Sequence, residues 1–211
     1  MKADTDMLEN MKKLIGNLNF WFMLISFALA YSSYSTLGAI VGPVTDKFGY
    51  TSNETSIFGV CFIVFGVLGS FIHAIMLDKY KMFKKQFLIV LGSSFLAYFL
   101  LIGSMPTGIS VLVAICLGIF GFCLIPVIGV GFSFTAINFS PISAAASCGI
   151  ANMLNAIVGC GLTAVVSIFY TESDDPDKPT PGSYKWIGLG ILSGSVFIGL
   201  IIGLLIKENV N

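Results

Sequence analysis

The feature of this sequence that most constrains its fold is a series of six apolar stretches in which no charged side chain occurs. A helix that crosses the roughly 30 Å hydrocarbon core of a bilayer needs about 20 mostly apolar residues. The stretches run over residues 20–41, 56–77, 86–102, 109–130, 145–169 and 186–206. The sequence therefore predicts an all-α membrane protein with six transmembrane helices.

The composition leaves no material for a soluble domain, because only 10% of the residues are charged, against roughly 25% in soluble proteins. We expect three parts. Residues 1–17 place Met7, Met11 and Leu14 on one face of an amphipathic helix, which would lie at the membrane interface or against a partner. Residues 18–206 form the six-helix transmembrane bundle, and residues 207–211 form a short tail.

The residues that would support catalysis or metal binding are missing from the connections between the apolar stretches. The five cysteines all lie inside apolar stretches and form no CxxC or Cys/His pair, which is typical of small apolar core residues. The connections carry no nucleophile and base pair and no phosphate-binding loop. We therefore expect no enzyme, no cofactor, no metal and no nucleic-acid partner.

The lysines predict the orientation in the membrane, since positive charge concentrates on the cytoplasmic side. An even number of spans places both termini on one side. That side would carry Lys2, Lys12, Lys13, Lys79, Lys81, Lys84, Lys85 and Lys207, and the opposite side only Lys47, Lys178 and Lys185. Both termini are therefore predicted to face the cytoplasm, or the matrix in a mitochondrial inner membrane.

Two local patterns mark the start of the second span. Thr51 is followed three residues later by Glu54, the spacing of a capping box in which each side chain satisfies an amide of the other residue. Residues 53–55 also match a glycosylation sequon. Because the sequon falls inside the predicted cap and against the membrane, we interpret it as structural.

Two blocks of the sequence carry a family resemblance. The first block contains Gly49, Tyr50, Thr51, Glu54, Gly59, Gly66, Gly69, Leu77, Asp78, Lys79, Lys81, Phe83 and Lys84, and the second contains Gly118, Gly121, Phe122, Pro126, Gly131, Phe132, Phe134, Pro141, Gly149 and Asn152. Together they resemble the major facilitator superfamily, and most of all the second half of its feline leukaemia virus subgroup C receptor-related branch, known for haem and choline transport.

The resemblance covers residues 18–206 and implies six helices arranged as two three-helix inverted repeats, which is half of a twelve-helix transporter. The chain also departs from the family pattern. Ser133, Ile137 and Ala144 stand where the family has glutamates, and Ala156 stands where it has a glutamine. A transporter that couples solute movement to an ion through such side chains would not find them at these positions of this chain.

Polar residues inside the spans are the candidates for a solute cavity. Tyr31, Tyr34 and Thr36 lie in a polar patch of the first span, and Asn152 and Asn155 lie three residues apart in the fifth. His73 lies near the inner end of the second span. Each of these residues either lines a cavity or makes hydrogen bonds between neighbouring helices, and the sequence favours the second interpretation.

The last span carries small residues at regular spacing. Gly190, Gly194, Gly199 and Gly203 lie on two adjoining stripes of one helix. Small residues at this spacing let two helix backbones approach closely in lipid. Because the last helix of each half lies at the periphery in the superfamily, the stripes predict a docking surface for another membrane protein.

Two functions remain open at this point. One is a degenerate half-size transporter that serves as a structural or accessory subunit of a larger membrane complex, for which the mitochondrial inner membrane is the expected location. The other is a solute transporter that works as a dimer of halves. Half size, missing carboxylates and the smooth last helix favour the accessory subunit. Expected partners are membrane lipids and other membrane subunits, with a small solute only if transport is retained.

The topology is testable by cysteine labelling in sealed membranes. Lys81→Cys, placed in a chain whose native cysteines are replaced by serine, should react with an impermeant maleimide from the side that carries both termini. The physical reason is the concentration of lysines in and around the connection that follows the second span. Labelling only from the side that carries residues 171–185 would reverse the topology.

Overall fold

The computed structural model describes residues 16–139, 143–170 and 184–207. The helices are α2 (Leu18–Lys47), α3 (Ser52–Tyr80), α4 (Phe83–Ser104), α5 (Ser110–Leu124), α6 (Val127–Asn138), α7 (Ala144–Ser167) and α8 (Tyr184–Leu205), with a short 3-10 turn, η1 (Met105–Thr107). Most of the predicted amphipathic helix, the acidic connection 171–183 and tail residues 208–211 lie outside the described residues.

Six helical segments in the described part of the chain are long and apolar enough to cross a membrane. The prediction of an all-α protein with six spans is confirmed. The fourth span was predicted to end at residue 130, but it continues to Asn138 as two helices, α5 and α6. The break falls at Pro126, because proline has no amide hydrogen for the helical hydrogen bond.

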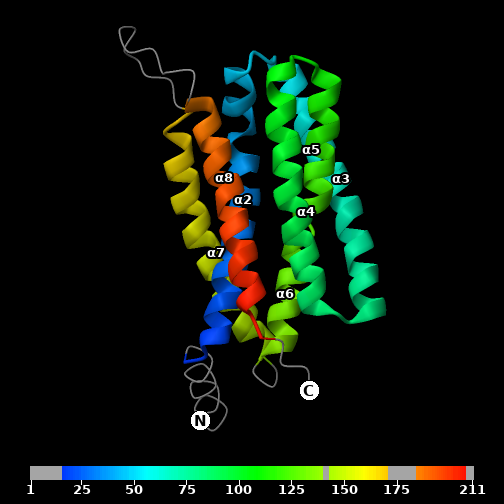
Figure 1. Cartoon of the computed structure of the whole chain (residues 1–211), viewed down its shortest axis with the longest axis vertical. Coiled ribbons are helices and arrows are strands. Elements are labelled where there is room, and N and C mark those ends of the chain that lie inside the picture. Colours follow the sequence, from blue (N-terminus) through cyan, green and yellow to red (C-terminus); the bar gives the residue numbers. More distant parts are fainter. Residues whose placement is uncertain (1–15, 140–142, 171–183, 208–211) are drawn as a thin grey trace.

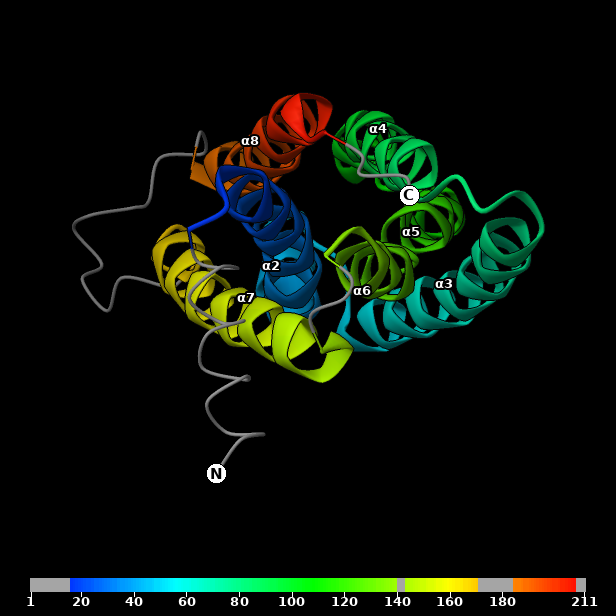
Figure 2. The same ribbon diagram turned by 90° about the horizontal axis from the view of Figure 1, so that it is seen from below.

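The helices pack as two repeats of three. The first repeat contains α2, α3 and α4, and the second contains α5 with α6, α7 and α8. The main contacts join the two repeats: α2 packs against α7 and α8, α5 packs against α3 and α4, and α4 and α8 pack against each other. Exchanging the first three spans with the last three maps these contacts onto one another. Figure 2 shows α4 and α8 on one side of the bundle, α2 with α5 and α6 in the middle, and α3 and α7 on the other side.

One end of the bundle carries the start of α2, the turn between α3 and α4, and the end of α8 (Figure 1). The lysine-rich connection around Lys81 therefore lies at the same end as the first and last described helix termini. This arrangement is the one that the even number of spans requires. Which compartment this end faces stays a prediction from the lysine distribution.

The capping box at the start of α3 is confirmed. The backbone amide of Thr51 donates to Glu54 Oε2 at 2.8 Å, and the amide of Glu54 donates to Thr51 Oγ1 at 3.4 Å. These two bonds satisfy amides that a helix start otherwise leaves without partners. The cap fixes the position of Glu54 at the end of the bundle.

Helices α3 and α5 cross closely through glycines on both helices. A Cβ atom on Gly69 would lie 2.3 Å from the carbonyl oxygen of Phe122, and one on Gly121 would lie 2.2 Å from that of Phe62. The backbones approach closely enough for Cα–H groups to contact carbonyl oxygens. Phe122 is also the residue four positions before Pro126, which has no N–H to donate back to it.

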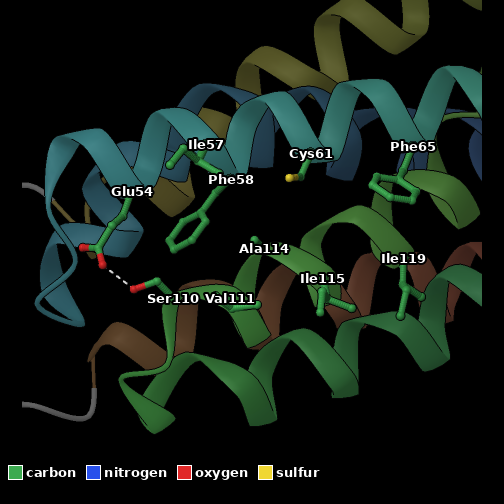
Figure 3. Close-up of a pocket in the computed structure, with 10 residues that line it drawn as sticks. All are labelled: Glu54, Ile57, Phe58, Cys61, Phe65, Ser110, Val111, Ala114, Ile115 and Ile119. Atoms are coloured by element: carbon green, nitrogen blue, oxygen red, sulfur yellow. Dashed lines mark hydrogen bonds between the residues drawn. The ribbon is translucent and has the colours of Figure 1, made fainter.

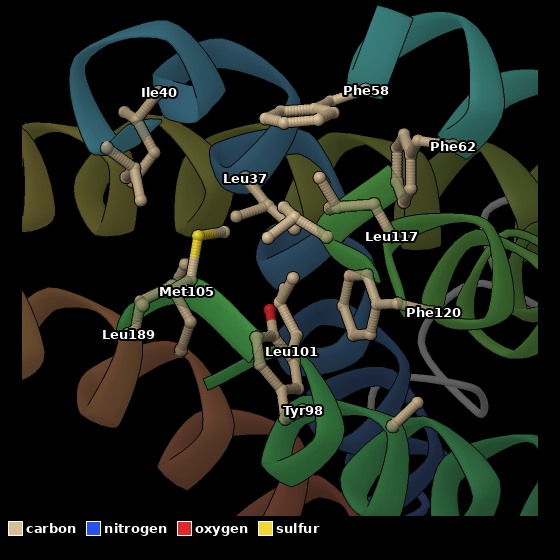
Figure 4. Close-up of a cluster of buried hydrophobic side chains, with 14 of the residues drawn as sticks. Leu37, Ile40, Phe58, Phe62, Tyr98, Leu101, Met105, Leu117, Phe120 and Leu189 are labelled. Atoms are coloured by element: carbon tan, nitrogen blue, oxygen red, sulfur yellow. The ribbon is translucent and has the colours of Figure 1, made fainter. Parts of the chain in front are cut away.

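The apolar core beside this crossing contains a row of aromatic rings. The Phe62 and Phe120 rings are stacked with centroids 5.9 Å apart, and the Tyr98 and Phe120 rings are 4.4 Å apart. Figure 4 shows these rings together with aliphatic side chains of α2 and α4, including Leu37 and Leu101. The row reaches from α3 through α5 to α4 and fixes the position of Phe62.

We expect Gly69→Ala to destabilise the bundle. The new methyl group would collide with a backbone carbonyl that cannot rotate away, and overpacking of this kind costs about 1 to 3 kcal/mol. The matched control is Gly92→Ala on α4, because no described atom lies within 4 Å of its Cβ position. Thermal melts in mild detergent should show a lower midpoint for Gly69→Ala only; equal midpoints would contradict the close crossing.

Candidate solute-binding face

Two pockets meet at Ser35 on the side of α2 that lies between α3 and α7. The first is lined by Tyr31, Ser35, Asn155, Ala156, Gly159, Cys160, Thr163 and Ala164, and the second by Tyr34, Ser35, Leu37, Gly38, Val41, Gly59, Phe62, Ile63 and Leu117. We call the surface formed by these residues the Ser35 face. It brings Tyr31, Tyr34 and Asn155, three of the residues predicted from the sequence, to one place.

Several hydroxyls of the predicted polar patch point into the bundle instead. Ser33 Oγ contacts the Leu192 carbonyl oxygen at 3.2 Å and Ser195 Oγ at 2.5 Å, which ties α2 to α8. Thr36 Oγ1 lies 2.8 Å from Thr163 Oγ1 on α7. Thr36 is therefore a buried link between helices, as the structural interpretation of the patch predicted.

Asn155 has the most distinctive environment on the Ser35 face. Its side chain is fully buried, and both its amide nitrogen and its amide oxygen find no hydrogen-bond partner among the residues that the structure describes. Buried amides are almost always paired, because leaving one unpaired costs about 1 to 3 kcal/mol. Asn155 therefore holds a donor and an acceptor, unpaired among the described residues, directly beneath the pocket that it lines.

Asn152 lies apart from this pocket although it is only three residues from Asn155. Its side chain is exposed, and it is absent from the residues that line either pocket of the Ser35 face. The pocket instead follows the spacing of four residues along α7, through Asn155, Gly159 and Thr163. This spacing places Gly159 and Thr163 on the same side of the helix as Asn155, and it was not among the features predicted from the sequence.

Aromatic rings form the second chemical feature of the face. Tyr31 and Tyr34 are 6.1 Å apart between ring centroids, and Tyr34 stacks on Phe62 at 6.0 Å. Phe27 extends the series 6.1 Å beyond Tyr31. The electron-rich faces of such rings attract cations, so a cation site built from them needs no carboxylate. The arrangement is suited to an organic cation that also carries a hydrogen-bonding group.

His73 lies outside this face. Its ring is buried between α3 and α4, with Nδ1 2.5 Å from the side-chain nitrogen of Gln86. The Phe122 ring packs beside it at 6.4 Å. The structure thus does not bring His73 to Tyr31 and Tyr34, and its Nδ1 is paired with Gln86 within the bundle.

Comparison with known proteins gives several distant relatives, while no protein-family model matches the chain. The chain is 24% identical over 198 residues to the choline/ethanolamine transporter FLVCR1 of Mus musculus, covering 93% of this chain and 34% of the relative. It is 24% identical over 152 residues to solute carrier family 49 member A3 of Danio rerio, covering 70% and 31%. It is 27% identical over 160 residues to the choline/ethanolamine transporter flvcr2a of Danio rerio, covering 75% and 34%.

These matches fall in the C-terminal part of the relatives and agree with the six-helix fold. The chain is a homologue of transporters of the major facilitator type. It spans about a third of the length of the curated relatives that it matches. These relatives confirm the resemblance found in the two sequence blocks.

One departure from the family pattern lies directly on the Ser35 face. Ala156, which stands where the family has a glutamine, lines the pocket beside Asn155. The side-chain amide of Asn155 thus lies one residue before the position at which the family pattern has the side-chain amide of a glutamine. Ile137 is half exposed on α6 and does not line either pocket of the face.

The glycines of the last span divide into two groups, which corrects the predicted docking surface. A Cβ atom on Gly199 would lie 3.1 Å from the Ser26 carbonyl oxygen, and one on Gly203 would lie 3.2 Å from Ser26 Oγ. Both glycines therefore pack inside the bundle, where α8 crosses α2. Gly190 and Gly194 have no described atom within 4 Å of their Cβ positions.

Leucine substitutions separate these two groups. Gly199→Leu should lower the melting midpoint of the isolated chain, because Leu has no room beside α2 and the Ser26 to Gly199 hydrogen bond of 2.6 Å would be disturbed. Gly190→Leu should leave the midpoint unchanged or raise it, since Leu is a better helix former than Gly. A destabilised Gly190→Leu variant beside an unaffected Gly199→Leu variant would contradict this packing.

Proposed function

We propose that the chain forms one six-helix wall of a solute transporter and that the Ser35 face lines its pathway. The observation that carries the proposal is Asn155, which is fully buried at a pocket that it lines and whose amide has no partner among the described residues. A solute that hydrogen-bonds this amide would recover the free energy lost in burying it. Structural hydrogen bonding between helices, which accounts for Thr36 and Ser33, does not account for Asn155.

The chemistry of the face favours a small organic cation with a hydroxyl group. Tyr31 and Tyr34 supply aromatic surface for an ammonium group, and Asn155 supplies a donor and an acceptor for a hydroxyl. Two of the relatives are named as choline/ethanolamine transporters, and amino alcohols of this kind carry both groups. We therefore propose a small amino alcohol as the solute.

The opposite wall of the pathway must come from a second six-helix unit, since the sites of such transporters lie between two repeats near the middle of the membrane. The two pockets of the Ser35 face are lined by residues of α2, α3, α5 and α7 and are only partly enclosed. A second copy of this chain or another six-helix segment would complete it.

An accessory subunit of a larger membrane complex, in the mitochondrial inner membrane or elsewhere, is the second candidate. One observation favours it: none of the residues that line the two pockets carries an ionisable carboxylate or amine. Transport driven by an ion gradient usually depends on such a group inside the membrane. Facilitated transport does not need one, so the two candidates differ in whether solute passes at all.

Uptake by reconstituted protein separates the two functions. The chain, purified with any subunit that remains bound to it, is placed in liposomes and tested with radiolabelled choline and ethanolamine. Asn155→Leu should reduce saturable uptake at least about tenfold, which corresponds to the loss of about 1.4 kcal/mol of solute binding. Its melting midpoint should stay the same or rise, because an unpaired buried amide has been removed.

Asn152→Leu is the matched control, because Asn152 is the same residue type on the same helix but lies outside both pockets. It should keep full uptake. Tyr34→Leu should lose uptake with its aromatic ring, whereas Tyr34→Phe should keep most of it. Saturable uptake that is equal in wild type and Asn155→Leu would exclude the proposed site, and no uptake in wild type would favour the accessory role.

A further inference from the structure

A separate apolar groove runs along the outer flank of the bundle between α3 and α5. It has a volume of about 350 Å³ and is lined on α3 by Ile57, Phe58, Cys61 and Phe65, and on α5 by Val111, Ala114, Ile115 and Ile119. Figure 3 shows the two helices running side by side with these side chains between them. None of these residues belongs to the Ser35 face.

The groove faces lipid rather than the Ser35 face. Gly59 and Ile63 line the Ser35 face from one flank of α3, while Phe58 and Phe65 line the groove from the other flank. The side chains at the mouth of the groove are strongly exposed, with 69% for Val111 and 57% for Ile57. In a bilayer such side chains meet acyl chains.

The charge of the groove is confined to one end. Glu54 is the only charged residue among those that line it, and Ser110 lies beside it. Glu54 Oε1 accepts a hydrogen bond from Ser110, and Oε2 accepts from Thr51. The capping box holds this carboxylate at the start of α3, at one end of a helix long and apolar enough to span a membrane. The position favours a cationic group and disfavours an anionic one.

The length of the groove corresponds to one leaflet. Residues 54 to 65 of α3 cover about 16 Å at a rise of about 1.5 Å per residue, and half of the hydrocarbon core is about 15 Å thick. The groove thus begins at a carboxylate near the surface and ends near the middle of the membrane. A single extended acyl chain has both the length and the width for this space.

We propose that this groove binds one acyl chain of a phospholipid whose headgroup carries a primary ammonium, as in phosphatidylethanolamine. The acyl chain packs between Phe58, Phe65 and Ile115. Each of its methylene groups gains dispersion contacts when it leaves the disordered lipid for the groove. The ammonium donates to the remaining lone pair of Glu54 Oε1, since Oε2 accepts from both the amide and the hydroxyl of Thr51. The lipid therefore joins α3 to α5 on the flank opposite the Ser35 face.

Lipid retention by the purified full chain tests the proposal. The protein in mild detergent is mixed with dioleoyl phosphatidylethanolamine or dioleoyl phosphatidylglycerol, and bound lipid is counted by native mass spectrometry. Because the acyl chains are identical, any difference comes from the headgroup. Wild type should retain the ethanolamine lipid at least about fivefold better, since phosphatidylglycerol is anionic and lacks an ammonium group. Equal retention of the two lipids by wild type would overturn the proposal.

Three variants test the groove itself. Val111→Trp fills the mouth of the groove from an exposed position and should reduce ethanolamine-lipid retention at least about fivefold. Val67→Trp, the matched control on an exposed part of α3 outside the groove, should not. Glu54→Gln keeps the capping box, because Gln also serves at this position, and should remove the headgroup preference. Equal retention in the two Trp variants, or a preference that survives in Glu54→Gln, would overturn the proposal.

Discussion

The close crossing of α3 and α5 determines the geometry on which both candidate sites depend. Gly69 and Gly121 bring each helix onto a backbone carbonyl of the other, and no side chain separates them there. This contact is possible in lipid because small residues allow dispersion and weak Cα–H contacts over a long interface. With α3 held in this way, one of its flanks contributes Phe62 to the Ser35 face and the other contributes Phe65 to the outer groove.

The polar residues of α2 serve two purposes that the structure separates. Ser33 and Thr36 bind neighbouring helices and hold α2 against α8 and α7. Tyr31, Tyr34 and Ser35 lie on the other side of the helix, at the two pockets. The same span therefore provides both the interhelical hydrogen bonds and the aromatic surface, and Asn155 of α7 adds the only fully buried amide of the face.

The sequence predicted those features that depend on local composition. Apolar length identified the six spans, and the pairing of Thr51 with Glu54 identified the cap, because both are set within one helix. Features that depend on the neighbour of a helix were missed or misassigned. Gly199 follows the same small-residue spacing as Gly190, yet only Gly199 meets α2. Asn152 and Asn155 share a helix and a residue type, and packing against α2 decides which of them is buried.

The central claim, that the Ser35 face lines a water-filled solute pathway, is tested most directly at Cys160. This residue is exposed and lines the same pocket as Asn155. Thiols react with impermeant methanethiosulfonates as thiolates, which form in water and not in lipid. In native membranes Cys160 should be modified, as identified by peptide mass against Cys160→Ser, and added choline should slow the reaction. A folded protein in which Cys160 stays unmodified would show that water does not reach the pocket that Cys160 lines, and would contradict the account.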